Sequence, residues 1–213
     1  MTVEIGMLLF PDVTQLDLTG PHEVLARMPD ARVTVVAKTL DPIHTESGLV
    51  ISPNATFTSA PSFELVFVPG GGGQIAATED ISTLDYLRAC ATRAKWMTSA
   101  CTGALLLGAA GLLDGYRAAT HWAFMDLLPL VGATPVHERV VVDRDRITGG
   151  GVTAGIDIAF AIVTELAGAP AAERIALQLE YGTSDNAALR ADVRRELAPR
   201  FAQREAQLRR LRR

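Results

Sequence analysis

Cys101 is the residue best placed for chemistry, because it lies between a short apolar run and an Ala- and Leu-rich stretch. The pattern predicts a strand over 96–100 and a helix from Thr102, with the cysteine at the turn between them. A side chain at such a turn projects from the carboxyl end of a strand, where α/β sheets bind ligands. N–H groups at a helix start can lower the pKa of a thiol, and a thiolate is a strong nucleophile. We therefore expect a nucleophile at Cys101, with a buried structural cysteine as the alternative.

A glycine-rich loop, Pro69-Gly70-Gly71-Gly72-Gly73, follows another apolar run of strand length. Successive glycines allow backbone N–H groups to converge on an anionic atom, as in an oxyanion hole. A flexible turn is the alternative. The Lys and Ser/Thr of a nucleotide-binding P-loop are absent. Beside Cys101 the loop is a candidate for stabilising a reacting atom.

Asp17 is an acid flanked by leucines just after the first apolar run. Burial between apolar side chains would raise its pKa, so that it holds and donates a proton near neutral pH. An N-cap on the helix that follows is an equally good interpretation, since aspartate often serves in that position.

His121 and Trp122 are adjacent, and a second glycine run occupies 149–151. A histidine is more often structural than catalytic, and a tryptophan can either line an apolar pocket or fill the core. The position after Cys101 is Thr102, so the chain lacks an adjacent Cys-His pair.

The secondary-structure elements that must position these residues show two kinds of hydrophobic pattern in turn along the chain. Apolar runs of strand length alternate with helical patterns, which predicts βαβ units and a mostly parallel sheet. Two short segments separated by Arg144-Asp145 predict an added hairpin. The expected fold is flavodoxin-like α/β, a doubly wound sheet with helices on both faces and a small β-hairpin addition. The expected strands are 3–10, 32–38, 64–68, 96–100, 139–143 and 146–149, and the expected helices are 18–28, 82–94 (with Ser82 as N-cap), 102–113 and 154–167.

Charge is distributed unevenly along the 213 residues. The net charge is −4, yet residues 186–213 carry nine arginines against three acidic residues, a local charge of +6. We expect 1–185 to form the catalytic domain and 186–213 to form a basic helical extension. A basic tail can bind nucleic acid, but no nucleic-acid motif is present, and packing on the protein itself is favoured.

Cysteine usage and the N-terminus bear on location. Cys90 and Cys101 form neither a metal-binding spacing nor a disulfide framework, and free thiols suit a reducing compartment. Cys90 lies among apolar residues of the expected helix 82–94, so a packing role is expected for it. No signal peptide or ~20-residue apolar span is recognisable, which predicts a cytoplasmic protein that does not contact a membrane.

The motifs taken together resemble the ThiJ/PfpI family, which shares the class I glutamine-amidotransferase-like fold. Within it they are most similar to the isocyanide (isonitrile) hydratases, which add water to R–N≡C to give an N-substituted formamide. The likeness extends from about Val3 to Tyr181. It rests on LDLTGPHEVL (16–25), VPGGGG (68–73), TSACTGALLLGAAGLL (98–113), ATHW (119–122) and TGGGVTAGID (148–157).

The resemblance implies roles for particular residues. Cys101 takes the place of the nucleophile, Asp17 that of the proton-handling acid, and Thr102 the position that holds His in the peptidase-like branch. Because Thr102 replaces that His, a protease or amidase role is disfavoured. The resemblance also implies a homodimer, a small isocyanide as substrate, and no metal or organic cofactor. The implied substrate-binding residues are Gly71, Gly72, His121, Trp122 and Gly150.

Three other functions remain open on these residues. A ligand-sensing regulator is one, because AraC-type regulators carry a similar domain, although about thirty residues after Tyr181 are too few for their DNA-binding region. A redox sensor using oxidation of Cys101 is another. Glyoxalase-like carbonyl chemistry with the same thiol and acid is the third.

Overall fold

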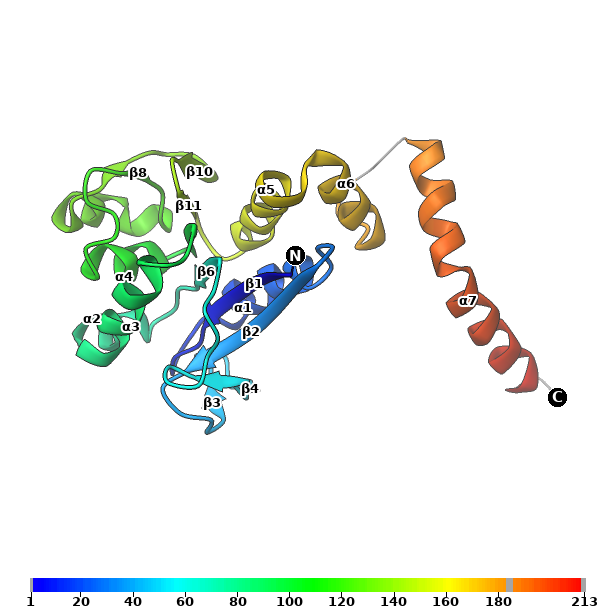
Figure 1. Ribbon diagram of the computed structural model, residues 1–213, viewed down its shortest axis with the longest axis horizontal. Helices are drawn as coiled ribbons and strands as arrows, with labels where there is room; N and C mark the ends of the chain where they lie inside the picture. The colour runs from blue at the N-terminus through cyan, green and yellow to red at the C-terminus, as the bar shows by residue number, and fades with distance from the viewer. Residues whose placement is uncertain (1, 183–185, 212–213) are drawn as a thin grey trace.

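A computed structural model describes residues 2–182 and 186–211 and is built around one large sheet (Figure 1). Within the described residues the sheet has seven strands in the order β10-β11-β7-β6-β1-β2-β5, all parallel except the β10–β11 hairpin. The expected flavodoxin-like fold with a hairpin addition is confirmed. The strands are β1 (Val3–Leu8), β2 (Ala31–Ala37), β5 (Ala55–Thr56), β6 (Leu65–Val68), β7 (Trp96–Ala100), β10 (Val140–Asp143) and β11 (Arg146–Gly149).

The central strands are covered on both faces. Every residue of β6 and β7 is buried, so side chains pointing to either side of the sheet meet packed helices. One helical group consists of α1 (Gln15–Leu25), α5 (Ala154–Ala167) and α6 (Ala169–Gln178). In this group α1 packs on α5, and α5 packs on α6. The other is α2 (Gln74–Glu79), α3 (Ile81–Ala91), α4 (Gly103–Ala109) and the 3-10 helix η1 (Trp122–Val131).

The remaining elements are small additions and a C-terminal helix. β3 (Ile43–His44) pairs with β4 (Val50–Ile51), and β8 (Arg117–Ala118) pairs with β9 (Thr134–Pro135). In Figure 1, α7 (Ala187–Leu211) extends away from the sheet, and it packs on α6. The expected domain boundary after residue 185 touches 183–185, which lie outside the described ranges. No helix in the described part of the chain is long and apolar enough to span a membrane.

Two helix starts differ from expectation. α1 begins at Gln15 with Thr14 as N-cap, so Asp17 lies inside the first turn and does not cap the helix. α3 begins at Ile81 after Asp80, and the Ser82 hydroxyl donates to that carboxylate instead of capping. In both cases another polar residue occurs shortly before the expected cap, and the apolar periodicity does not reveal which one starts the helix.

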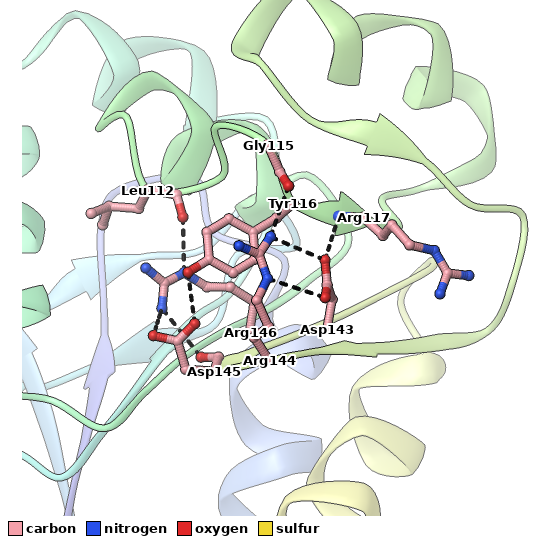
Figure 2. A network of polar contacts seen from close by, with 8 residues as sticks. All are labelled: Leu112, Gly115, Tyr116, Arg117, Asp143, Arg144, Asp145 and Arg146. Carbon is pink, nitrogen blue, oxygen red and sulfur yellow. Dashed lines mark hydrogen bonds and ion pairs between the residues drawn. The ribbon is translucent and has the colours of Figure 1, made fainter.

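A cluster of charged and aromatic side chains joins the turn of the β10–β11 hairpin to the segment 112–117, which follows α4 (Figure 2). The Tyr116 ring lies near two guanidinium groups, 3.6 Å from that of Arg144 and 4.7 Å from that of Arg146. The Tyr116 hydroxyl donates to Asp145 (2.7 Å), while Arg146 donates to the Leu112 carbonyl (2.8 Å). These contacts lie at the start of β11, whose other end reaches the turn that holds Cys101.

Candidate active site

The Cys101 backbone adopts a left-handed conformation, with φ of +53°, at the turn from β7 into α4. A non-glycine residue in this region is held there by its surroundings. The Cys101 N–H donates to the carbonyls of Gly149 (3.1 Å) and Gly150 (2.8 Å), and the Thr120 hydroxyl donates to the Cys101 carbonyl (2.7 Å). The side chain is 5% exposed. The turn therefore fixes the thiol in a nearly closed site.

Gly103 permits the close approach of two backbones at this turn. A Cβ atom at Gly103 would lie 2.2 Å from the Val68 carbonyl oxygen and 2.7 Å from that of Pro69. These atoms belong to rigid backbone, so no other residue fits without displacing the turn. The carboxyl ends of β6 and β7 can thus lie together, which brings the glycine loop beside Cys101.

Asp17 reaches the same site from α1 and is fully buried. Its Oδ2 accepts the Gly70 N–H at 3.0 Å, whereas its Oδ1 has no hydrogen-bond partner of good geometry among the described residues. Burial is the main cause that raises the pKa of Asp17, the Gly70 N–H and the nearby Cys101 thiol lower it, and the charge of Glu46 raises it, for a net pKa of about 7. Asp17 can therefore bind and release a proton near neutral pH.

The thiol of Cys101 differs from expectation. Burial, and after it the charge of Asp17, raise the pKa of Cys101, whose net value is about 12 because hydrogen bonds from Thr102 act in the opposite direction. The increase in thiol pKa caused by removal from water thus exceeds the decrease caused by the N–H groups at the start of α4. The expected lowering of the thiol pKa is wrong for the free protein. Above pH 7 the Asp17–Cys101 pair holds one proton. A thiol in this state needs a base, and Asp17 interacts with it directly.

The glycine-loop amides are already engaged. The Gly71 N–H donates to the Thr102 hydroxyl oxygen (3.1 Å), and the Gly72 N–H donates to Glu46 Oε2 (3.1 Å). A Cβ at Gly70 would lie 2.6 Å from the Thr102 nitrogen and 2.9 Å from Asp17 Oδ2. In the free protein the loop therefore orients the acid and the residue after the cysteine, and these amides do not point at an empty position.

The remaining predicted residues lie around the end of β11. Gly150 bonds Cys101, and its neighbour Gly151 lies against His121, since a Cβ there would be 3.0 Å from the imidazole Cδ2. His121 Nδ1 accepts the Ala123 N–H (3.3 Å), so the imidazole caps the N-terminus of η1. The Trp122 indole is 79% exposed and lies on the surface. The structure thus brings Gly150 to the cysteine and His121 to the adjacent glycine, but leaves Trp122 at the rim.

Two residues that build the site were not singled out from sequence. Glu46 accepts the Thr14 hydroxyl (2.5 Å) through one oxygen and the Gly72 N–H through the other, so it joins the start of α1 to the glycine loop. Thr120 is buried and holds the Cys101 carbonyl. Glu46 lies in a polar turn with no recognisable pattern. Thr120 lies within the ATHW motif (119–122), which was the available signal for it.

No group of three or more His, Cys, Asp or Glu side chains that could hold a metal ion occurs among the described residues. Cys90 and Cys101 are both free thiols. Cys90 is half-buried on α3, where burial raises its pKa and the Tyr86 hydroxyl interacts with it. This environment agrees with the expected packing role of Cys90.

Asp17→Asn is expected to reduce the dependence of folding stability on pH. The folded pKa of about 7 lies above the usual value of 3.8, so the native state binds the extra proton and stability falls as pH rises between these values. An amide cannot ionise. The loss of unfolding free energy between pH 4 and pH 8 should therefore shrink by roughly 4 kcal/mol in the variant. Urea unfolding at both pH values measures this; an unchanged difference would contradict a buried carboxylate at position 17.

Comparisons with known proteins give a consistent family assignment. The sequence profile of the DJ-1/PfpI family matches residues 3–165. The isonitrile hydratase of Pseudomonas putida is 52% identical over 181 residues, which cover 85% of this chain and 79% of that protein. The HTH-type transcriptional regulator GbdR of Pseudomonas aeruginosa (strain UCBPP-PA14) is 32% identical over 75% of this chain, but over only 45% of its own length.

Solved structures agree with the fold. A ThiJ/PfpI family protein from Pseudomonas syringae has a TM-score of 0.84 at 41% identity, covering 93% of this chain and 87% of that chain. DJ-1beta of Drosophila melanogaster has a TM-score of 0.76 at 22% identity, covering 86% of this chain and 100% of that chain, a likeness of fold alone. The resemblance expected from the motifs is thus confirmed.

Proposed function

The chain belongs to the DJ-1/PfpI family, and on that premise we propose that it is an isocyanide hydratase, an enzyme that converts R–N≡C and water into R–NH–CHO. The observation that carries the proposal is the buried pair of Asp17 and Cys101, with a carboxyl pKa of about 7 beside a thiol at a strained turn. The 52% identity to the isonitrile hydratase of Pseudomonas putida supports the reaction class.

The first step forms a bond between Cys101 Sγ and the isocyanide carbon. That carbon is soft and weakly electrophilic, which suits a sulfur nucleophile. As the bond forms, the thiol proton passes to Asp17 and from there to the carbon, whose lone pair becomes the new C–H bond. The product is the thioimidate Cys–S–CH=N–R. Asp17 Oδ1 is the oxygen for this transfer, since Oδ2 is fixed by Gly70.

The second step adds water to the thioimidate carbon. Asp17 takes a proton from the water and passes it to the thioimidate nitrogen, so that the carbon carries H, S, OH and NHR. Collapse of this intermediate forms the C=O bond, breaks the C–S bond and returns a proton to Cys101. Atoms balance as R–N≡C + H₂O → R–NH–CHO, and the pair regains its single proton.

Thr102 stabilises the developing sulfur charge in this scheme. Its N–H and hydroxyl both interact with the Cys101 sulfur and lower the pKa of the thiol. Gly71 fixes that hydroxyl, and Gly72 fixes Glu46, so we assign these amides a positioning role in the free enzyme. His121 and Gly150 would line the substrate side, with Trp122 at its entrance.

Thr102→Val is expected to lower kcat about 10- to 100-fold, because a hydrogen bond to a charged group is worth about 1.5–3 kcal/mol. Valine keeps the shape but loses the hydroxyl that interacts with Cys101 and receives the Gly71 N–H. Thr102→Ser restores the hydroxyl and should keep most of the activity. Steady-state kinetics of both variants measure this. Equal activity of the valine variant and wild type would rule out a catalytic contribution of the Thr102 hydroxyl.

We also propose an oligomeric state and a cellular location for the protein. Large apolar side chains such as Leu130 (80% exposed) and Trp122 lie uncovered on η1, which supports a homodimer. Free thiols at positions 90 and 101 support a cytoplasmic setting. The catalytic unit would be 1–185, with 186–213 as a basic helical extension, acting without metal or organic cofactor.

Turnover of a para-substituted phenyl isocyanide tests the function. We expect the formyl proton of the N-aryl formamide to appear in NMR spectra in proportion to enzyme concentration. Methylglyoxal, assayed in parallel, tests the carbonyl alternative of the same thiol and acid. Conversion of methylglyoxal with an untouched isocyanide would move the assignment to glyoxalase-like chemistry.

A ligand-sensing module is a second candidate, favoured by the match to the regulator GbdR over 75% of this chain. A sensor binds its ligand without consuming it. Saturable isocyanide binding with no formamide, equally in wild type and Cys101→Ala, would favour this role over catalysis.

A further inference from the structure

A cavity of about 690 Å³ lies beyond the active site, at the carboxyl ends of β1 and β2. Its walls come from 9–12, 38–44, Phe57 and the α2–α3 region. Cys101, Asp17, Thr102 and the glycines 70–72 are not among its lining residues. The volume falls within the range of small-molecule sites, and the carboxyl edge of a parallel sheet is where such sites occur.

The walls of this cavity are mostly apolar and include two aromatic rings. Phe10 and Phe57 line it from just beyond the ends of two strands, and Pro42, Ile43 and Ala77 add apolar surface. Phe57 is held by a stacked contact with Tyr86, at a ring-centroid distance of 4.2 Å. A ligand for this space needs an apolar, preferably aromatic, body.

The charged groups of the lining are predominantly negative. Lys38 is paired with Asp80 at 3.0 Å, and Asp80 also accepts the Ser82 and Thr83 hydroxyls, so this pair is internally satisfied. Asp12 and Asp41, both exposed residues, also line the cavity; within the described part of the chain neither forms an ion pair, and Asp41 accepts the Thr39 hydroxyl (2.9 Å). Two carboxylates thus remain without a cation, in a setting that favours a positively charged ligand.

Asp12 is also held in an unusual conformation. Its φ is +55°, its N–H donates to the His44 carbonyl (2.9 Å), and its carbonyl accepts the Gly73 N–H (3.0 Å). Aspartate is one of the few non-glycine residues that adopt this conformation readily, so position 12 can form the turn and still carry a carboxylate. The backbone bonds place the Asp12 carboxylate at the cavity, where no described residue bonds it.

We propose that this cavity is a second ligand site, separate from the cysteine, and that it binds a small organic cation with an aromatic body, of the arylalkylammonium class. The ring lies between Phe10 and Phe57, where the aromatic faces also attract the cation, and the ammonium group pairs with Asp12 and Asp41. The site is independent of the proposed hydration reaction, because it shares no lining residue with the Cys101 pair.

Calorimetric titration with benzylammonium, benzyl alcohol and benzoate tests this site, since the three probes share a ring and differ in charge. We expect one-to-one binding of benzylammonium, with a Kd at least about tenfold below those of the other two, a difference of about 1.4 kcal/mol. The double variant D12N/D41N should weaken benzylammonium binding by a similar factor. Asparagine tolerates the left-handed conformation at position 12, so the fold is preserved.

Three further variants locate benzylammonium binding within the molecule. Asp126→Asn removes an exposed carboxylate on η1 and should leave Kd unchanged, whereas Ala76→Phe fills the cavity and should abolish binding. Cys101→Ser should bind normally, whatever its catalytic activity. Loss of binding in Cys101→Ser, equal affinity for benzoate, an unchanged Kd in D12N/D41N, or no binding of benzylammonium would each overturn the proposal.

Discussion

Cys101→Ala should remove formamide formation, with a loss in kcat/KM of roughly 10⁴-fold or more. The scheme has no other nucleophile, and alanine leaves the isocyanide carbon with only water to attack it. Serine should be nearly as poor, because a buried hydroxyl with an even higher pKa than the thiol cannot be deprotonated by a carboxylate whose pKa is about 7. NMR detection of the formyl proton measures both variants.

Cys90 provides the matched control for this experiment. It is the chain's other cysteine, half-buried on α3, and Cys90→Ala should retain near wild-type turnover. Circular dichroism should show intact folds, since alanine and cysteine meet the same cost at the left-handed position 101. Wild-type turnover by Cys101→Ala would remove the cysteine from the mechanism.

Asp17→Asn should lower kcat/KM by roughly 10²–10⁴-fold, the usual contribution of a positioned acid–base group. The amide can still accept the Gly70 N–H, so the backbone of the site is retained. What disappears is the transfer of the thiol proton to the isocyanide carbon.

The same residue sets the pH profile. Below pH 7 both Asp17 and Cys101 are protonated, and no base is available to the thiol. As pH rises through about 7 the pair loses one proton, so kcat/KM should rise and then level off. Asp17→Asn should show no such rise. A wild-type profile that instead falls across pH 7 would mean that the doubly protonated pair reacts.

Sequence patterns predicted the framework well where one physical signal dominates. β7, α5 and the turn at Arg144-Asp145 match within a residue, because buried strands are continuously apolar, a buried helix is apolar throughout, and a hairpin needs turn residues. The position of Cys101 at the carboxyl end of β7 followed from the same change of periodicity.

Tertiary contacts decided what sequence patterns could not. The pKa values of Asp17 and Cys101 depend on burial, and burial depends on side chains brought together from distant segments. Glu46 bonds Gly72 from a polar turn far away in the chain, which no local pattern signals. The glycine loop was expected to offer free amides, yet Thr102 occupies one of them.

Mapping the covalent intermediate tests the central claim most directly. Wild-type enzyme turning over an aryl isocyanide is quenched in acid, digested and analysed by mass spectrometry. The peptide containing Cys101 should gain the full mass of the isocyanide, because the thioimidate keeps every atom of substrate and thiol. Steady formamide production with no adduct at position 101, or with an adduct on the Cys90 peptide, would contradict nucleophilic catalysis by Cys101.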